Sequence, residues 1–143
     1  MKNKLRLIII LLLVLCPGCK ASRGINVQVP SPETGFAIIY GELVTPTNEP
    51  IKDMTIRLAR VYRFDDLDDE GTFILDDAKS PSATSDDQGK YMFLNIEPGE
   101  YVLIIGSIHI DYKIISESTD IPIVYEVGPG DTLRIDPEVV DFD

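Results

Sequence analysis

Residues 84–105 read TSDDQGKYMFLNIEPGEYVLII, in which two apolar runs each follow a polar turn. Tyr91 and Phe93 are two positions apart, so in a β-strand both side chains point to one face and into a core. The residues before them, Asp86 to Gly89, are typical of a tight turn whose glycine can adopt a positive φ. The stretch therefore predicts two β-strands and a core-facing aromatic pair.

A second turn lies inside this stretch, where residues 96–101 (IEPGEY) end in a tyrosine and are typical of a tyrosine corner. In such a corner the tyrosine hydroxyl donates to a nearby backbone carbonyl and fixes the crossover of a β-sandwich. Since these turns and strands build the fold, we predict structural rather than catalytic roles for six residues. These are Gly89, Tyr91, Phe93, Pro98, Gly99 and Tyr101.

The rest of the chain beyond residue 34 also reads as strands. Apolar or alternating segments recur at roughly 8–12 residues with turn residues between them, which is typical of an all-β sandwich. No apolar period of 3.6 residues persists, so no helix is predicted. We expect about seven strands. The expected segments are 36–44, 54–62, 90–95, 101–110, 114–115, 121–127 and 132–135.

Residues 41–51 and 84–105 together resemble the carboxypeptidase regulatory-like domain. That family has a first strand with glycine, a turn that ends in proline, and the signature T-x-x-x-x-G-x-[FY]-x-[FL]-x-x-[LI]-x-P-G-x-Y, which Thr84 to Tyr101 match. The resemblance implies a transthyretin-like (prealbumin-like) Greek-key β-sandwich over residues 35–143. No zinc peptidase domain accompanies the module in this chain.

The first 18 residues have the composition of a secretory signal peptide. A basic start is followed by the apolar run 5–15, which is shorter than the roughly 20 residues needed to span a bilayer as a helix. Gly18-Cys19 then resembles the lipobox of bacterial lipoproteins, although Cys16 occupies the position where that family usually has leucine. The resemblance implies that Cys19 is lipidated and becomes the N-terminus, which places an extracytoplasmic anchor in the cell membrane or outer membrane.

These features divide the chain into three parts. Residues 1–18 are the expected cleaved signal peptide, and 19–34 are the lipidated N-terminus and a tether that is punctuated by Pro30 and Pro32. Residues 35–143 are the expected β-sandwich, which is long enough to bury a core without disulfides.

The charge balance limits the partners. The chain has 24 acidic and 13 basic residues, and three of the basic ones lie in the leader, so the mature chain has a formal side-chain charge of −14. Such a charge repels nucleic acid and anionic headgroups. We therefore expect the membrane to be contacted through the N-terminal lipid, with an envelope protein or ligand as the further partner and no nucleic acid.

One acidic segment, residues 65–77, offers a weak metal site. Asp66, Asp68, Glu70 and Asp77 partly match the spacing of a 12-residue calcium loop. The twelfth position is Asp rather than the bidentate Glu, and the preceding segment reads as a strand rather than a helix. The alternative is a solvated acidic insertion with a small strand near 73–75. We therefore predict no cofactor, with calcium as the alternative.

The single histidine, His109, lies in an apolar run two residues after Ser107. It could act as a base or ligand, but a surface or sheet-edge histidine is the simpler interpretation. No base–nucleophile pair, P-loop or dinucleotide motif is found, so we predict no enzyme and no catalytic residue. The expected function is a non-enzymatic, lipid-anchored envelope module for protein interaction or scaffolding. The alternative is ligand binding, with calcium at 65–77 or a glycan at exposed tyrosines, although tryptophan is absent.

Overall fold

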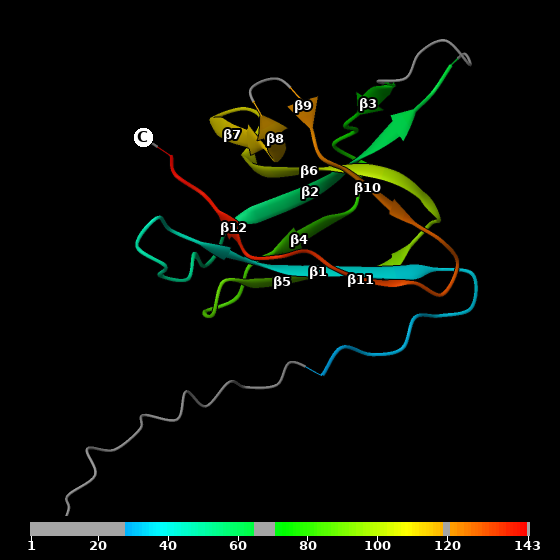
Figure 1. Ribbon diagram of the computed structural model, residues 1–143, viewed down its shortest axis with the longest axis horizontal. Coiled ribbons are helices and arrows are strands. Elements are labelled where there is room, and N and C mark those ends of the chain that lie inside the picture. Colours follow the sequence, from blue (N-terminus) through cyan, green and yellow to red (C-terminus); the bar gives the residue numbers. More distant parts are fainter. Residues whose placement is uncertain (1–27, 65–70, 119–120, 143) are drawn as a thin grey trace, which may run out of the picture.

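The computed structural model describes residues 28–64, 71–118 and 121–142, which are all-β (Figure 1). The predicted all-β sandwich class is confirmed. Within these ranges, no helix is long and apolar enough to cross a membrane. The strands are β1 (Ala37–Val44), β2 (Thr55–Tyr62), β3 (Thr72–Ile74), β4 (Ser82–Thr84), β5 (Lys90–Ile96), β6 (Gly99–Ser107), β7 (Asp111–Ile114), β8 (Ser116–Ser118), β9 (Ile121–Pro122), β10 (Val124–Val127), β11 (Thr132–Arg134) and β12 (Glu138–Val139).

The first sheet is built around β1. Its neighbour β5 runs antiparallel to it, whereas β11 and β12 pair with it in parallel. β11 lies opposite Ile38 to Tyr40 and β12 lies opposite Leu43 and Val44, so the end of the chain forms one interrupted strand beside the first strand.

The second sheet has the order β10-β6-β2-β3, with β7 also paired to β6 and β4 also paired to β2. The central strands β6 and β2 run antiparallel, with Arg60 opposite Tyr101 at one end and Ile56 opposite Ile105 at the other. The chain alternates between the sheets as it passes from β1 to β2, from β4 to β5 and from β5 to β6. A separate hairpin of β8 and β9 follows β7.

The core lies between these two sheets. Tyr91 and Phe93 are only 3% and 2% exposed, as expected for core residues, and their rings meet edge to face at 5.9 Å. The ring of Tyr91 lies over Gly41, where a Cβ would come within 2.5 Å of the tyrosine hydroxyl. A side chain at Gly41 would therefore displace the aromatic pair. The large aliphatic residues of the core cluster that are fully buried are Ile39, Leu43, Ile56, Leu58, Leu103 and Ile105.

The strands are more numerous than expected from the sequence, and two of the expected segments are shortened or divided. The expected strand 101–110 ends at Ser107, because Ile110 N donates to Ser107 O at 3.0 Å and closes a turn. The expected strand 121–127 is divided into β9 and β10, and the small strand expected near 73–75 is β3. These short strands lie at sheet edges, where few partners set their length.

Candidate functional site

The two turns predicted to be structural have defined hydrogen bonds. Gly89 has a φ of 76°, and its N–H donates to Asp86 O at 2.9 Å. The Asp86 carboxylate accepts from the N–H groups of Gln88 and Lys90 at 2.8 and 2.9 Å. Asp86 thus closes the turn from its side chain, as aspartate does in an Asx turn.

Tyr101 makes the hydrogen bond that a tyrosine corner requires. Its hydroxyl donates to the carbonyl of Glu97, four residues upstream, at 2.8 Å. Pro98 and Gly99 lie in the turn between these two residues, at the start of β6. The tyrosine therefore joins the β5–β6 connection to the core.

The two buried tyrosines should respond differently to the same substitution. Tyr101→Phe removes a hydrogen bond and should lower the free energy of unfolding by about 1 kcal/mol. Tyr91→Phe removes a hydroxyl that has no hydrogen-bond partner among the described residues, so it should leave stability unchanged or raise it by up to about 1 kcal/mol. Urea unfolding of both variants measures the difference. Equal losses would contradict these roles, since both tyrosines are 3% exposed.

The weak calcium candidates are only partly visible. Asp66, Asp68 and Glu70 lie outside the described residues, as does Cys19. Asp77 is described, and its carboxylate forms an ion pair with Arg57. In the described part of the chain, no three His, Cys, Asp or Glu side chains gather where they could hold a metal. Asp77 therefore already has a cationic partner.

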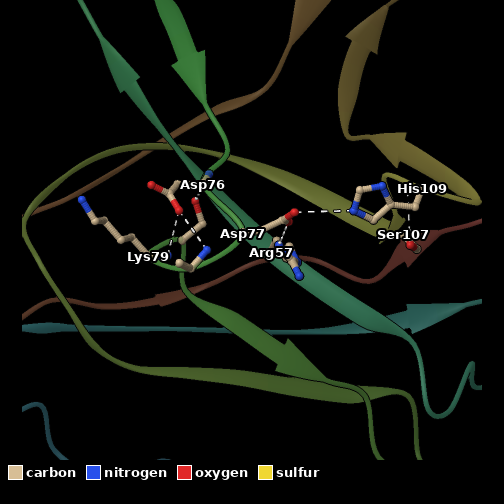
Figure 2. Close-up of polar contacts among 8 residues, drawn as sticks. Arg57, Asp76, Asp77, Lys79, Ser107 and His109 are labelled. Carbon is tan, nitrogen blue, oxygen red and sulfur yellow. Dashed lines mark hydrogen bonds and ion pairs between the residues drawn. The ribbon is translucent and has the colours of Figure 1, made fainter.

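Figure 2 shows Asp77 between Arg57 and the imidazole of His109. The imidazole Nε2 lies 3.5 Å from Asp77 Oδ2, and the histidine side chain is 77% exposed. Ser107 Oγ accepts from the backbone N–H of His109 at 3.4 Å rather than from its ring. The arrangement is that of a solvent-exposed ion-pair cluster, not of a nucleophile beside its base.

A recess opens where β2 extends past the sandwich, and we call it the β2–β3 recess. Leu58, Arg60 and Tyr62 share one face of β2, and their exposure increases from buried to exposed along the strand. Ile74 of β3 lies opposite Arg60. The β5–β6 turn forms the facing wall with Glu97. The recess is open to solvent and has a volume of about 490 Å³.

The charges in the β2–β3 recess are balanced, and the Arg60–Glu97 pair is held in place. Arg60 Nη1 donates to Glu97 Oε2 at 2.8 Å and Arg60 Nη2 donates to Pro98 O at 3.2 Å. The hydrogen bond to Glu97 raises the pKa of the Arg60 guanidinium. Lys79 and Asp76 add one further cation and one further anion.

The loop that carries Lys79 and Asp76 is fastened by its own hydrogen bonds. Asp76 Oδ1 accepts from Ala78 N at 2.8 Å and from Lys79 N at 3.2 Å, as Figure 2 shows for the second contact. Ser80 Oγ accepts from Asp76 N at 2.9 Å. This wall of the recess is therefore preformed by local turn contacts.

A second hollow of about 490 Å³ lies on the four-stranded sheet. Tyr40, Met92 and Arg134 line it together with Val29, which belongs to the tether. Figure 1 shows the chain from residue 28 returning along this sheet before β1 begins. The tether itself thus forms one side of this hollow.

Apolar side chains are exposed at the end of β6, and we call them the β6–β7 patch. Ile108 and Ile110 lie in the turn and Tyr112 lies in β7. Ile110 is 90% exposed, and the other two are also exposed. The apolar run predicted a single strand up to Ile110, and that prediction is wrong because a turn after Ser107 presents these side chains to solvent.

Comparisons with known proteins identify no relative. No family model matches the chain, and no curated protein matches it. Among solved structures, a protein of Pseudomonas aeruginosa provisionally described as carbohydrate-binding is 13% identical, with a TM-score of 0.43 over 76% of this chain and 92% of that one. The major pilin subunit of Bacillus cereus is 17% identical, with a TM-score of 0.42 over 76% of this chain and 30% of that one. At this level of likeness neither assigns a function.

Proposed function

We propose that this chain is a non-enzymatic, lipid-anchored module of the cell envelope that binds or scaffolds another envelope protein. The anchor would be Cys19, after removal of residues 1–18, with residues 19–34 as tether and 35–143 as the presented domain. The leader and the Gly18-Cys19 pair support the anchor and an extracytoplasmic location at the cell membrane or outer membrane. The Thr84–Tyr101 signature supports a carboxypeptidase regulatory-like, transthyretin-like module.

The β6–β7 patch is the observation that carries the protein-binding role. Exposed apolar side chains that lie close together mark interaction surfaces more often than isolated ones do. Ile108, Ile110 and Tyr112 fall within one turn and the strand that follows it. The strongly acidic chain favours a partner whose apolar contact is surrounded by basic residues.

Two further points belong to this proposal. The position of His109 beside Asp77, with Ser107 turned to the backbone, supports a role without catalysis. We propose no nucleic-acid partner, because the −14 charge of the mature chain opposes binding of the phosphate backbone. We also propose no cofactor.

Capture of the partner tests the proposal. The tagged full-length protein is purified from detergent-solubilised membranes of its own organism, as wild type and as Ile110→Ser/Tyr112→Ser. We expect a stoichiometric protein partner with the wild type and a loss of about tenfold or more with the double variant, since exposed anchors dominate such interfaces.

The control is Leu94→Ser, which changes an apolar residue of the other sheet that is 54% exposed, close to the 49% of Tyr112. It should retain the partner. Absence of any stoichiometric partner, or equal recovery with both variants, would contradict the proposed role of the patch.

Ligand binding is the second candidate function, and the β2–β3 recess is the observation that favours it. An aromatic ring and paired charges line a hollow of the size typical of ligand sites. The calcium form of this alternative has less support, because Asp77 is paired with Arg57.

A further inference from the structure

We propose that the β2–β3 recess binds a neutral saccharide. This goes beyond the protein-binding role, because the recess and the β6–β7 patch share no lining residue; the loop that carries Asp76 approaches the patch where Asp77 lies 3.5 Å from the imidazole of His109. The recess is at the end where Arg60 faces Tyr101, and the patch follows the end where Ile56 faces Ile105. One molecule of this protein could therefore hold a saccharide in the recess and a protein partner at the patch at the same time.

The aromatic wall of the recess is the first argument. Tyr62 is 41% exposed, and its ring stacks on Phe64 with the centroids 6.3 Å apart and the planes 20° apart. An aromatic ring that is held in this way offers a flat apolar surface at little entropic cost. The C–H face of a pyranose ring is the flat, weakly polar partner that such a surface fits. Ile74 continues the apolar wall beside it.

The polar groups around that ring are the second argument. Sugar hydroxyls donate and accept, so they need both kinds of partner within one site. Lys79 and Arg60 supply donors, and Asp76 and Glu97 supply acceptors. The Asn95 amide donates to Glu33 Oε1 at 3.4 Å and still offers its carbonyl oxygen and a second N–H. The guanidinium of Arg60 is already fixed by Glu97 and by Pro98 O, so the Arg60–Glu97 pair is oriented before a ligand arrives.

The charge of the recess selects a neutral ligand. Its two cations and two anions cancel, and the mature chain carries a formal charge of −14. A phosphorylated or sulfated sugar would be repelled by the carboxylates of Asp76 and Glu97 at short range and by the net negative charge of the chain at long range. A cationic ligand would be repelled by Arg60 and Lys79. A volume of about 490 Å³ is within the range of small-ligand sites.

Titration with defined neutral oligosaccharides tests the proposal. The full chain in detergent is titrated with chitotetraose, cellotetraose and maltotetraose by isothermal calorimetry. We expect at least one of them to bind. Tyr62→Ala should weaken that binding about tenfold or more, whereas Tyr62→Phe, which keeps the ring, should change it less than about threefold. Phe142→Ala, an exposed aromatic residue outside the recess, should leave it unchanged.

A second measurement does not depend on any variant. In amide NMR spectra of the wild-type protein, the bound oligosaccharide should shift the signals of Arg60, Tyr62, Asn95 and Glu97 and leave those of Ile110 and Tyr112 in place. Glucose 6-phosphate is titrated in the same way as a charged comparison. The proposal is overturned if none of the three neutral probes binds, if the shifts lie elsewhere, or if only glucose 6-phosphate binds. Since Tyr62→Ala should still capture the protein partner, failure here and failure of the partner experiment are distinguishable.

Discussion

Gly89→Ala is expected to lower the free energy of unfolding by about 2–5 kcal/mol, since it adds a steric clash to an unfavourable backbone conformation. Gly89 has a φ of 76°, and a Cβ there would lie 2.4 Å from the carbonyl oxygen of Leu43 and 3.2 Å from the N–H nitrogen of Ile51. Both are backbone atoms, and they are hydrogen-bonded to one another. Neither can swing aside as a side chain would. Urea unfolding of the purified protein measures the loss.

Gly130→Ala is the matched control for this prediction. Gly130 has a φ of 83°, which is close to that of Gly89, yet nothing lies within 4 Å of its Cβ position. The control should therefore show only the backbone cost of about 1–2 kcal/mol. Equal losses in the two variants would contradict this prediction, because they would mean that the close contact between Gly89 and Leu43 adds nothing to the cost of the substitution.

Cys19→Ser is expected to abolish the attachment of lipid. Cells that express the tagged protein are grown with a labelled fatty acid, and the label on the purified protein is counted. The wild type should carry label, and the variant should fall to background because serine offers no thiol to acylate. Without several acyl chains, a protein with a −14 charge would have little affinity for an anionic bilayer.

Cys16→Ser provides the control for this result, because it removes the other cysteine of the chain and leaves the Gly18-Cys19 pair intact. It should keep the label. Label that persists in Cys19→Ser, or that disappears in Cys16→Ser, would contradict the assignment of the anchor to Cys19.

Local patterns predicted those parts of the fold that depend on near neighbours. The two-residue alternation of Tyr91 and Phe93 was sufficient to place both side chains in the core. The turn at Asp86 to Gly89 and the hydrogen bond of Tyr101 each join residues that are only a few positions apart. Such features are determined by turn chemistry and strand periodicity.

The recess could not be predicted, because its walls come from distant parts of the chain. Arg60 and Glu97 are 37 residues apart, and they meet only because β2 and β6 pair in one register. The segment 54–62 was predicted as a strand, but the point at which that strand leaves the sandwich was not. The ion pair between Arg57 and Asp77 is equally non-local, so the acidic spacing alone suggested a metal ligand.

The ends of the strands could also not be predicted from the sequence patterns. Ile108 and Ile110 continue an apolar run, yet the backbone turns after Ser107, and these side chains are exposed. Apolar periodicity does not distinguish a buried strand from an exposed turn when the residues are the same. The parallel pairing of β11 and β12 with β1 joins the two ends of the domain, which no local pattern specifies.

The mass of the mature N-terminal peptide is the decisive measurement for a lipid-anchored envelope module. The protein is isolated from the membranes of its own organism and cleaved after Glu33, the first acidic residue of the chain. The peptide should begin at Cys19 and carry the additional mass of several acyl chains. A peptide that begins at Met1, or that begins at an unmodified Cys19, would contradict the anchor and with it the proposed place of this domain in the envelope.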